Sequence, residues 1–261
     1  MSAKNGTGYT IGFAVAVCLV CSVFVCVSAV ALKDRQQSNK ELDQQKNVLK
    51  AAGLIKPGDD VDKAAIALMY KSITPLVVEM KTGLVKSDID PAQVNMREDI
   101  TDSAKSFIPA SNDAKVLRVP LNGIVYRFVE NGKTKMLILP VSGKGLWSTL
   151  YGFLALDIDT STIKGVSFYE HGETPGLGGE IENPSWTALW KGRKIFNERF
   201  EPVFKVKKGA AGSVDDDPFQ VDGLSGATLT GKGVTALIDF WTGKEGYGPF
   251  LENFRKERGV K

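Results

Sequence analysis

One uninterrupted apolar stretch near the N-terminus constrains this chain more than any other feature. Residues Ile11–Leu32 carry no charge, and Ser22 and Ser28 are the only polar side chains among them. At about 1.5 Å per residue such a helix is roughly 33 Å long, enough to cross a hydrocarbon core of about 30 Å. The alternative is a cleaved signal peptide, with Lys4 before the stretch and the small-x-small pattern Ala29–Ala31 as its cleavage site. Because the apolar regions of signal peptides usually span about 7–15 residues, the stretch predicts a transmembrane helix.

The cysteine, histidine and charge content excludes several kinds of site. All three cysteines, Cys18, Cys21 and Cys26, lie inside the apolar stretch, and His171 is the only histidine. The rest of the chain therefore has no disulfide framework, no thiolate metal site and no multi-histidine zinc site, and no metal ligand is predicted. The 33 basic and 30 acidic residues are spread along the chain, for a net charge of +3. Nucleic acid is therefore not an expected partner, whereas membrane lipid is.

The remaining sequence begins with two predicted helices. Residues 33–55 contain no proline and no glycine before Gly53, and their apolar residues recur at helical spacing, which predicts a helical stalk. A second helix is expected to begin at Asp60 as N-cap and to end before Pro75. The predicted parts are a short N-terminal segment at 1–10, the transmembrane helix at 11–32, the stalk at 33–55 and an extramembrane domain at 56–261.

From about residue 115 the sequence pattern favours strands. Apolar residues alternate from 116 to 120, and two β-rich runs at 124–130 and 135–139 flank Asn131-Gly132, which predicts a hairpin. Further strands are expected at 149–158, 163–169 and 202–206, and helices at 184–190 and 232–241. Strands joined by hairpins, with the helices set apart, predict an α+β domain with a mainly antiparallel sheet and flanking helices.

The first segment that indicates chemistry is Glu170–Gly179. Four glycines and Pro175 exclude regular helix or strand, so the segment is predicted to be a loop whose backbone can approach a ligand closely. The alternative is a glycine-rich turn capped by Glu173 and Thr174. His171 alone is expected to be a hydrogen-bonded structural histidine.

The second segment is Asp222–Thr230, which leads into the predicted helix at 232–241. Unpaired N–H groups and the positive end of the helix dipole make such a place a natural anion site. In the alternative, Ser225, Thr228 or Thr230 is only an N-cap. Residues Gly226–Lys232 also match G-x-x-x-x-G-K, but glycine follows the lysine where a nucleotide-hydrolysing P-loop needs Ser or Thr to hold Mg²⁺.

These segments resemble a known family. Asp222–Thr228 resembles the flavinylation motif D-x-x-[ST]-G-A-T of FMN-binding domains, and Glu170–Gly178 resembles their E-H-x-E-T-P-G-L-G segment. With Gly143–Thr149 and the N-terminal anchor, the whole chain is similar to the family of C subunits of the Na⁺-translocating NADH:quinone oxidoreductases. The G subunits of Rnf-type electron transport complexes share both motifs and the anchor and are the alternative. The Gly143–Thr149 run and Gly178–Pro184 favour the C subunits.

The resemblance implies covalent FMN, joined through a phosphoester to Thr228. It implies a separate Mg²⁺-dependent flavin transferase that supplies FMN from FAD and recognises Asp222, so Thr228 is a modification site and no catalytic residue is expected. Trp147 and Leu177 are expected to contact the isoalloxazine ring, with core packing as the alternative for Trp147, and Lys207 or Lys208 to lie near the phosphate. The residues expected to hold FMN are Leu146, Trp147, Glu173, Thr174, Pro175, Gly176, Leu177, Gly178, Lys207, Asp222, Gly223, Ser225, Gly226 and Ala227.

The resemblance also implies a place in an electron-transfer chain. FMN on this chain would receive electrons from an iron centre and pass them to FMN on the B subunit, toward ubiquinone. The implied partners are the other members of a six-subunit complex, especially the B, D and E subunits, in a bacterial inner membrane, with the N-terminus cytoplasmic and the domain periplasmic. No G-x-G-x-x-G follows a strand, so NADH oxidation is expected on another subunit. A non-enzymatic anchored binding or assembly protein is a further alternative.

Overall fold

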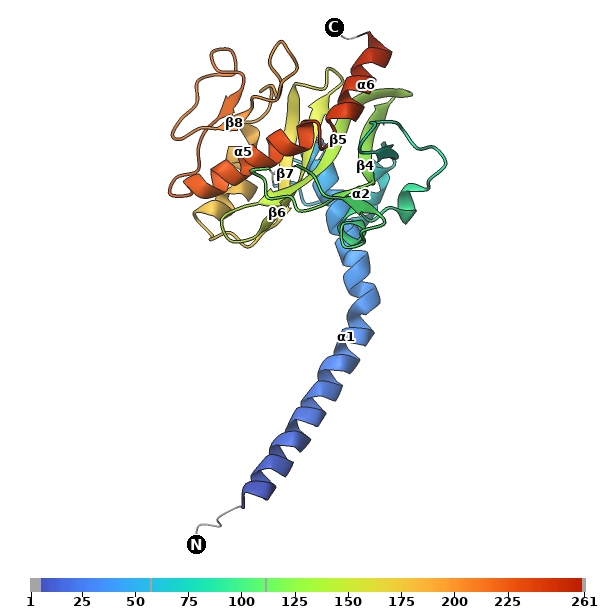
Figure 1. Ribbon diagram of the computed structural model, residues 1–261, viewed down its shortest axis with the longest axis vertical. Coiled ribbons are helices and arrows are strands. Elements are labelled where there is room, and N and C mark those ends of the chain that lie inside the picture. The colour runs from blue at the N-terminus through green and yellow to red at the C-terminus, as the bar shows by residue number, and fades with distance from the viewer. Residues whose placement is uncertain (1–5, 57, 111, 260–261) are drawn as a thin grey trace. The chain divides into compact units, whose positions relative to one another are not determined.

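The N-terminal part of the longest helix forms a compact unit of its own. A computed structural model describes residues 6–56, 58–110 and 112–259 and divides the chain into two units, Met1–Gln44 and Gln45–Lys261. Helix α1 runs without a break over Thr7–Ala51 (Figure 1). Within the described ranges it is the one helix long and apolar enough to cross a membrane.

The last turns of α1 belong to the second unit and are buried there. Val48, Leu49 and Ala51 are fully buried, and the Ser167 hydroxyl donates a hydrogen bond to the Asn47 side-chain oxygen at 3.1 Å. The helix ends at Ala51, and Gly53, two residues later, has a φ of +71°, the left-handed conformation that glycine adopts just after helix ends. These turns thereby become part of the folded domain.

Helix α2 and strand β1 differ from the sequence prediction. Helix α2 spans Lys63–Tyr70, and its N-cap is Asp62, not Asp60, because the Asp62 carboxylate accepts the Ala65 N–H at 2.7 Å. The next element, β1 (Ile73–Glu79), was not predicted because it contains Pro75. Strand β1 lies at the edge of the sheet, where the missing N–H of a proline is tolerated.

The central sheet has the strand order β1-β4-β5-β6-β7, and every neighbouring pair is antiparallel. Its other strands are β4 (Asn122–Glu130), β5 (Lys133–Lys144), β6 (Thr149–Asp157) and β7 (Ile163–Glu170). The hairpin at Asn131-Gly132 is confirmed, and both residues have positive φ, as a type I′ turn requires. The predicted α+β class with a mainly antiparallel sheet is confirmed.

The remaining elements are short, except for the last two helices. Two strand pairs stand apart from the central sheet: antiparallel β2 (Ser106–Phe107) with β3 (Val119–Pro120), and parallel β8 (Lys205–Val206) with β9 (Gln220–Val221). The short helices are η1 (Pro91–Gln93), α3 (Met96–Asp99), η2 (Gly178–Glu182) and α4 (Pro184–Ala188). The strands predicted at 116–120 and 202–206 are thus reduced to two residues each. The chain ends in α5 (Thr228–Thr242) and α6 (Gly248–Arg258), of which α6 was not predicted.

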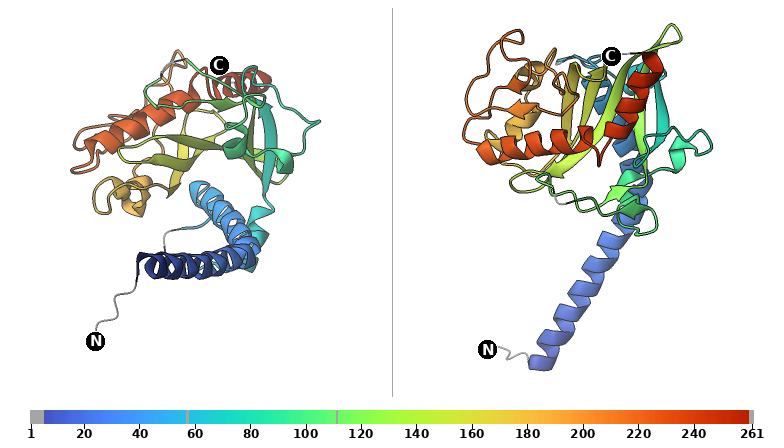
Figure 2. Two further views of the ribbon diagram at one scale, coloured as in Figure 1. Left: turned by 60° about the horizontal axis from the view of Figure 1, so that its bottom comes forward. Right: turned by 45° about the horizontal axis from the view of Figure 1, so that its top comes forward.

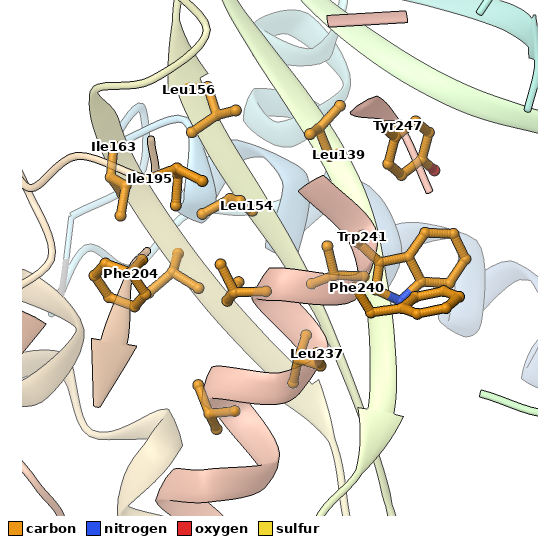
Figure 3. Packing of buried hydrophobic residues seen from close by; sticks show 14 of the residues in the cluster. Leu139, Leu154, Leu156, Ile163, Ile195, Phe204, Leu237, Phe240, Trp241 and Tyr247 are labelled. Carbon is orange, nitrogen blue, oxygen red and sulfur yellow. The ribbon is translucent and has the colours of Figure 1, made fainter. Parts of the chain in front are cut away.

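Helix α5 packs its apolar face on the central sheet. Leu237, Phe240 and Trp241 lie against Leu139 and Leu154 of β5 and β6, in one buried cluster (Figure 3). Helices α5 and α6 lie on one side of the sheet, and the final turns of α1 lie on the other (Figure 2). The sheet is therefore covered on both faces, and α5 is fixed firmly to it.

Two glycines let α5 approach the end of β5 unusually closely. A Cβ atom at Gly233 would lie 2.4 Å from the Lys144 carbonyl oxygen, and one at Gly143 would lie 2.6 Å from the Leu237 Cβ. Neither position has room for a side chain. The start of α5 is thereby placed beside the connection that follows β5.

Candidate functional site

Three segments that are distant in the sequence meet at the start of α5. They are the β5–β6 connection at 145–148, the loop after β7 at 171–178, and residues 222–230. A Cβ atom at Gly226 would lie 2.8 Å from Leu177 Cδ2, so the Leu177 side chain covers Gly226. The fold therefore brings together both segments that were singled out in the sequence.

The loop after β7 contains a tight turn. Pro175 and Gly176 occupy its two central positions, and Gly176 has a φ of +74°, as expected of a type II turn. The Thr174 carbonyl oxygen accepts the Leu177 N–H at 3.1 Å and the Gly179 N–H at 2.9 Å. These backbone hydrogen bonds close the turn. Leu177, the last residue of the turn, is 43% exposed.

The Glu173 side chain points inward from this loop. Glu173 is 5% exposed, and its carboxylate accepts the backbone N–H groups of Leu146 at 3.2 Å, Trp147 at 2.9 Å and Ser148 at 3.3 Å. The Thr230 hydroxyl donates a fourth bond at 2.6 Å. In the alternative of a glycine-rich turn capped by Glu173 and Thr174, the part given to Glu173 is therefore wrong, because its carboxylate joins all three segments, whereas Thr174 does close the turn.

These contacts favour the ionised form of the Glu173 carboxyl group. Burial raises the pKa of the carboxyl group, but the bonds from the Thr230 hydroxyl and the three amides outweigh burial, so its pKa is lowered. The pKa of Glu173 is therefore lower in the folded state than in the unfolded state. At pH values above the unfolded-state pKa, the ionised carboxylate stabilises the fold. This contribution is lost as pH falls through the folded-state value.

His171 has a structural environment, as expected. Its Nδ1 accepts the Glu173 N–H at 3.1 Å. Nε2 lies 3.0 Å from a carboxylate oxygen of Glu182 but forms no hydrogen bond with any of the described residues. The bond at Nδ1 holds the ring against the backbone of its own loop.

Thr228 is the first residue of α5 and is exposed. Ala227 precedes it as the N-cap residue and forms no side-chain capping bond. The Thr230 hydroxyl is bonded to Glu173, so the alternative in which Ser225, Thr228 or Thr230 serves as the N-cap is wrong. The first-turn amides and the positive end of the helix dipole favour an anion at Thr228.

A cavity of about 120 Å³ adjoins Thr228 and is lined by three lysines. Lys207 and Lys208 come from the segment after β8, and Lys232 follows Thr228 by one helical turn. Lys207 Nζ lies 3.7 Å from a carboxylate oxygen of Asp217. The sequence pattern indicated Lys232 only as the lysine of the P-loop alternative. Its i, i+4 spacing from Thr228 puts the two residues on one face of the helix and could have predicted that Lys232 lies beside Thr228.

The P-loop alternative does not fit the structure. A P-loop wraps its backbone around phosphate before the helix begins, whereas α5 already begins at Thr228. Lys232 lies in the second turn of the helix instead of at its start. The glycines of this segment serve close packing, since a Cβ atom at Gly223 would collide with the Lys207 carbonyl oxygen.

The same three segments expose large apolar side chains. Trp147 is 67% exposed and Leu146 40% exposed, so core packing as the role of Trp147 is wrong. Leu229, beside Thr228, is 55% exposed; it was not singled out in the sequence, although its position next to the expected modification site was a signal that could have found it. A flat apolar ring is the kind of ligand that such surfaces hold.

Asp222 holds the lysine-bearing segment in place. Its carboxylate accepts the Ala211 N–H at 2.8 Å, and its carbonyl oxygen accepts the Trp186 indole N–H at 2.8 Å. The Gly223 N–H also donates to the Gly209 carbonyl oxygen. Of the other predicted residues, Ser225 is exposed on the same segment.

Arg193 fixes the other end of this segment and was not singled out in the sequence. Its buried guanidinium donates to the carbonyl oxygens of Gly212 at 2.8 Å and of Ser213 at 3.2 Å, and also to that of Asp217. A rigid fork of donors suits such a set of carbonyls. Asp222 and Arg193 thereby hold this segment at two places.

Replacing Arg193 with glutamine is expected to lower the free energy of unfolding by about 1–2 kcal/mol, because buried carbonyl oxygens lose charged donors. Chemical denaturation of the full-length chain in detergent measures the change. The exposed Arg199 gives the matched control, since Arg199→Gln should change stability by no more than about 0.5 kcal/mol. Equal effects of the two substitutions would contradict the role given to Arg193.

Comparison with known proteins identifies close relatives. The FMN-binding domain family matches residues 145–242, which include all three segments of the site. The chain is 45% identical to the C subunit of the Na(+)-translocating NADH-quinone reductase of Pseudomonas aeruginosa, over 98% of this chain and 99% of that protein. It is 42% identical to the protein of the same name from Vibrio parahaemolyticus, over 94% of each chain.

Two crystal structures share the fold. That of Shewanella oneidensis NqrC superposes with a TM-score of 0.76 at 34% identity and covers 84% of this chain and 99% of that one. That of the C subunit of the Na(+)-translocating NADH-quinone reductase from Parabacteroides distasonis has a TM-score of 0.64 at 28% identity, covering 84% and 96%.

Proposed function

The chain belongs to the C-subunit family of the Na⁺-translocating NADH-quinone reductases, and on this premise we propose that it carries FMN as a phosphoester of Thr228 and relays electrons toward quinone. The observation that carries the proposal is the position of Thr228. It lies exposed at the uncapped start of α5, beside a cavity lined with lysines and among segments that expose apolar side chains.

The site suits both ends of FMN. The uncapped amides and the nearby lysines complement the phosphate, with Lys207, Lys208 and Lys232 as counter-charges. Trp147, Leu177 and their apolar neighbours Leu146 and Leu229 offer surface for the isoalloxazine ring. Bound FMN supplies one-electron chemistry, while this chain binds and orients it.

A second enzyme is needed to attach the flavin. A threonine hydroxyl is a weak nucleophile, and a base beside Thr228 would be needed to activate it. The sole histidine, His171, is engaged with Glu173 and Glu182. In the proposed reaction an Mg²⁺-dependent flavin transferase joins the Thr228 oxygen to the FMN phosphorus of FAD and releases AMP, with Asp222 in the recognised segment.

The proposed electron path runs through partner subunits. Electrons reach this chain from an iron centre and leave for the flavin of the B subunit, with the D and E subunits as further neighbours in a six-subunit complex. The exposed apolar residues around Thr228 support this arrangement, because a carrier near the surface can come close to its partners. The relatives from Pseudomonas aeruginosa, Vibrio parahaemolyticus and Vibrio vulnificus are named as C subunits, which supports this assignment over the Rnf-type G subunit.

We further propose that α1 anchors the chain in a bacterial inner membrane. Its charge-free stretch of 22 residues, Ile11–Leu32, is longer than the apolar region of about 7–15 residues in a signal peptide, which supports an anchor. The N-terminus would lie in the cytoplasm and the domain in the periplasm. Residues Ile11–Leu32 carry no acidic or basic side chain, so Na⁺ transport is a property of the assembled complex.

Intact-mass measurement of the full-length chain, produced in membranes together with the transferase, tests the attachment. The expected mass is that of the chain plus FMN less one water, located on the peptide that contains Thr228, with flavin fluorescence persisting in a denaturing gel. A colourless, unmodified chain in a complex that still reduces quinone would support the assembly-protein alternative instead.

A further inference from the structure

We infer that Glu173 is a positioning residue, whose carboxylate holds the ring-facing β5–β6 connection and the tether-bearing start of α5 in one fixed arrangement. The inference rests on the proposed function, because it assigns Glu173 the task of ordering a flavin that is attached elsewhere. It differs from a direct contact with FMN, the role that the resemblance implied for this residue.

The first support is how the Glu173 carboxylate is surrounded. Three consecutive backbone N–H groups, those of Leu146, Trp147 and Ser148, converge on it. Such a group of amides is ordinarily a binding place for an anion, and here the chain fills it with its own side chain. Among the described residues no lysine or arginine lies within ion-pair distance of it, so neutral donors alone hold the charge.

The second support is the absence of space around this carboxylate. A Cβ atom at Gly145 would lie 2.7 Å from one carboxylate oxygen, and one at Gly178 would lie 2.8 Å from the other and 2.6 Å from the Thr230 hydroxyl. Glycine at both positions lets the carboxylate reach its donors. The contacts are therefore part of a close-packed arrangement, and a side chain at either glycine would disrupt it.

The third support is what the joined segments carry. Thr230 lies two residues after the proposed tether Thr228, and the bonded amides belong to the exposed Leu146 and Trp147. The loop that provides Glu173 also presents Leu177. One carboxylate thus links the tether to every apolar surface proposed for the ring except Leu229, which lies on α5 itself.

It follows that the attachment of the flavin and the ordering of its ring depend on different residues. The covalent bond is formed by Thr228, so the flavin remains attached when the carboxylate is removed. The segments that face the ring are then free to move relative to the tether. A chain substituted at Glu173 should therefore be fully modified with flavin, but the isoalloxazine ring of that flavin should be mobile.

Glu173→Gln and the pair Thr230→Val and Thr230→Ser test this inference in the full-length chain loaded by the transferase. Glutamine removes the charge and replaces one acceptor by a donor, so the amides can no longer all be satisfied. Valine at position 230 keeps the shape but lacks the O–H donor, and serine restores it. Glu180→Gln is the matched control, since the Glu180 carboxylate accepts only a local bond from Asn183.

Two readouts apply to the attached flavin alone: its fluorescence anisotropy and its quenching by iodide. For Glu173→Gln and Thr230→Val, the anisotropy of the flavin should fall toward that of free FMN and its quenching by iodide should rise. Thr230→Ser and Glu180→Gln should match the unaltered chain.

A thermal unfolding scan identifies any variant that has lost its fold. If a folded Thr230→Val chain holds its flavin as rigidly as the unaltered chain does, the inference is overturned while the proposed function stands. A wild-type chain without flavin would overturn the proposed function itself.

Discussion

A chain in which Thr228 is replaced by valine is expected to fold normally and to carry no covalent flavin. Valine keeps the shape of threonine but has no oxygen to form the phosphoester. The side chain is exposed at the start of α5, and a surface substitution of this kind changes stability by about 0.5 kcal/mol or less. The intact mass should equal that of the unmodified chain, and the denaturing gel should show no flavin fluorescence.

The control for this experiment is Thr74→Val. Thr74 is an exposed threonine of the edge strand β1, outside the three segments of the site. This variant should be fully modified. In the assembled complex, Thr228→Val should abolish NADH-driven quinone reduction, whereas Thr74→Val should preserve it. Covalent flavin on the Thr228→Val chain would show that another residue is the attachment point.

Replacing Gly233 with alanine is expected to destabilise the domain by about 2–3 kcal/mol. Alanine favours a helix over glycine by about 1 kcal/mol, but the added Cβ would lie 2.4 Å from the backbone carbonyl oxygen of Lys144. Overpacking against a backbone atom cannot be relieved by a side-chain rotation, so α5 has to move away from β5. The denaturation midpoint of the full-length chain in detergent measures this loss.

Gly231, on the same helix, provides the matched control. A Cβ atom there would lie 3.1 Å from Val206 Cγ1, a side-chain atom that can shift. Gly231→Ala should therefore change stability by less than about 1 kcal/mol, because the gain in helix propensity offsets a mild contact. If both substitutions lower the free energy of unfolding equally, the close approach of α5 to β5 does not determine the stability of the domain.

The parts of the fold that local sequence determines were predictable. Asn131-Gly132 specifies a type I′ hairpin by itself, because both residues tolerate positive φ. The apolar spacing in 232–241 predicted the buried face of α5. Strand β1 was missed because Pro75 argues against a strand unless its place at the sheet edge is known.

The parts of the site that depend on tertiary contacts were not predictable from residue patterns. The start of α5 was placed at Lys232 rather than at Thr228, because its first turn is held by Glu173 and by close packing on β5. The inward direction of the Glu173 carboxylate also has no local signal. Its donors lie about 25 residues earlier and 57 residues later in the chain. The motifs indicated which segments matter, and the fold shows how they are joined.

The missing cap at the start of α5 has a consequence for the order of maturation. A helix that begins without a side-chain acceptor leaves backbone donors unsatisfied, and an attached phosphate group would satisfy them. Loading the redox group would thus also complete a piece of secondary structure, so the newly made protein and the mature one would differ in the rigidity of that first turn.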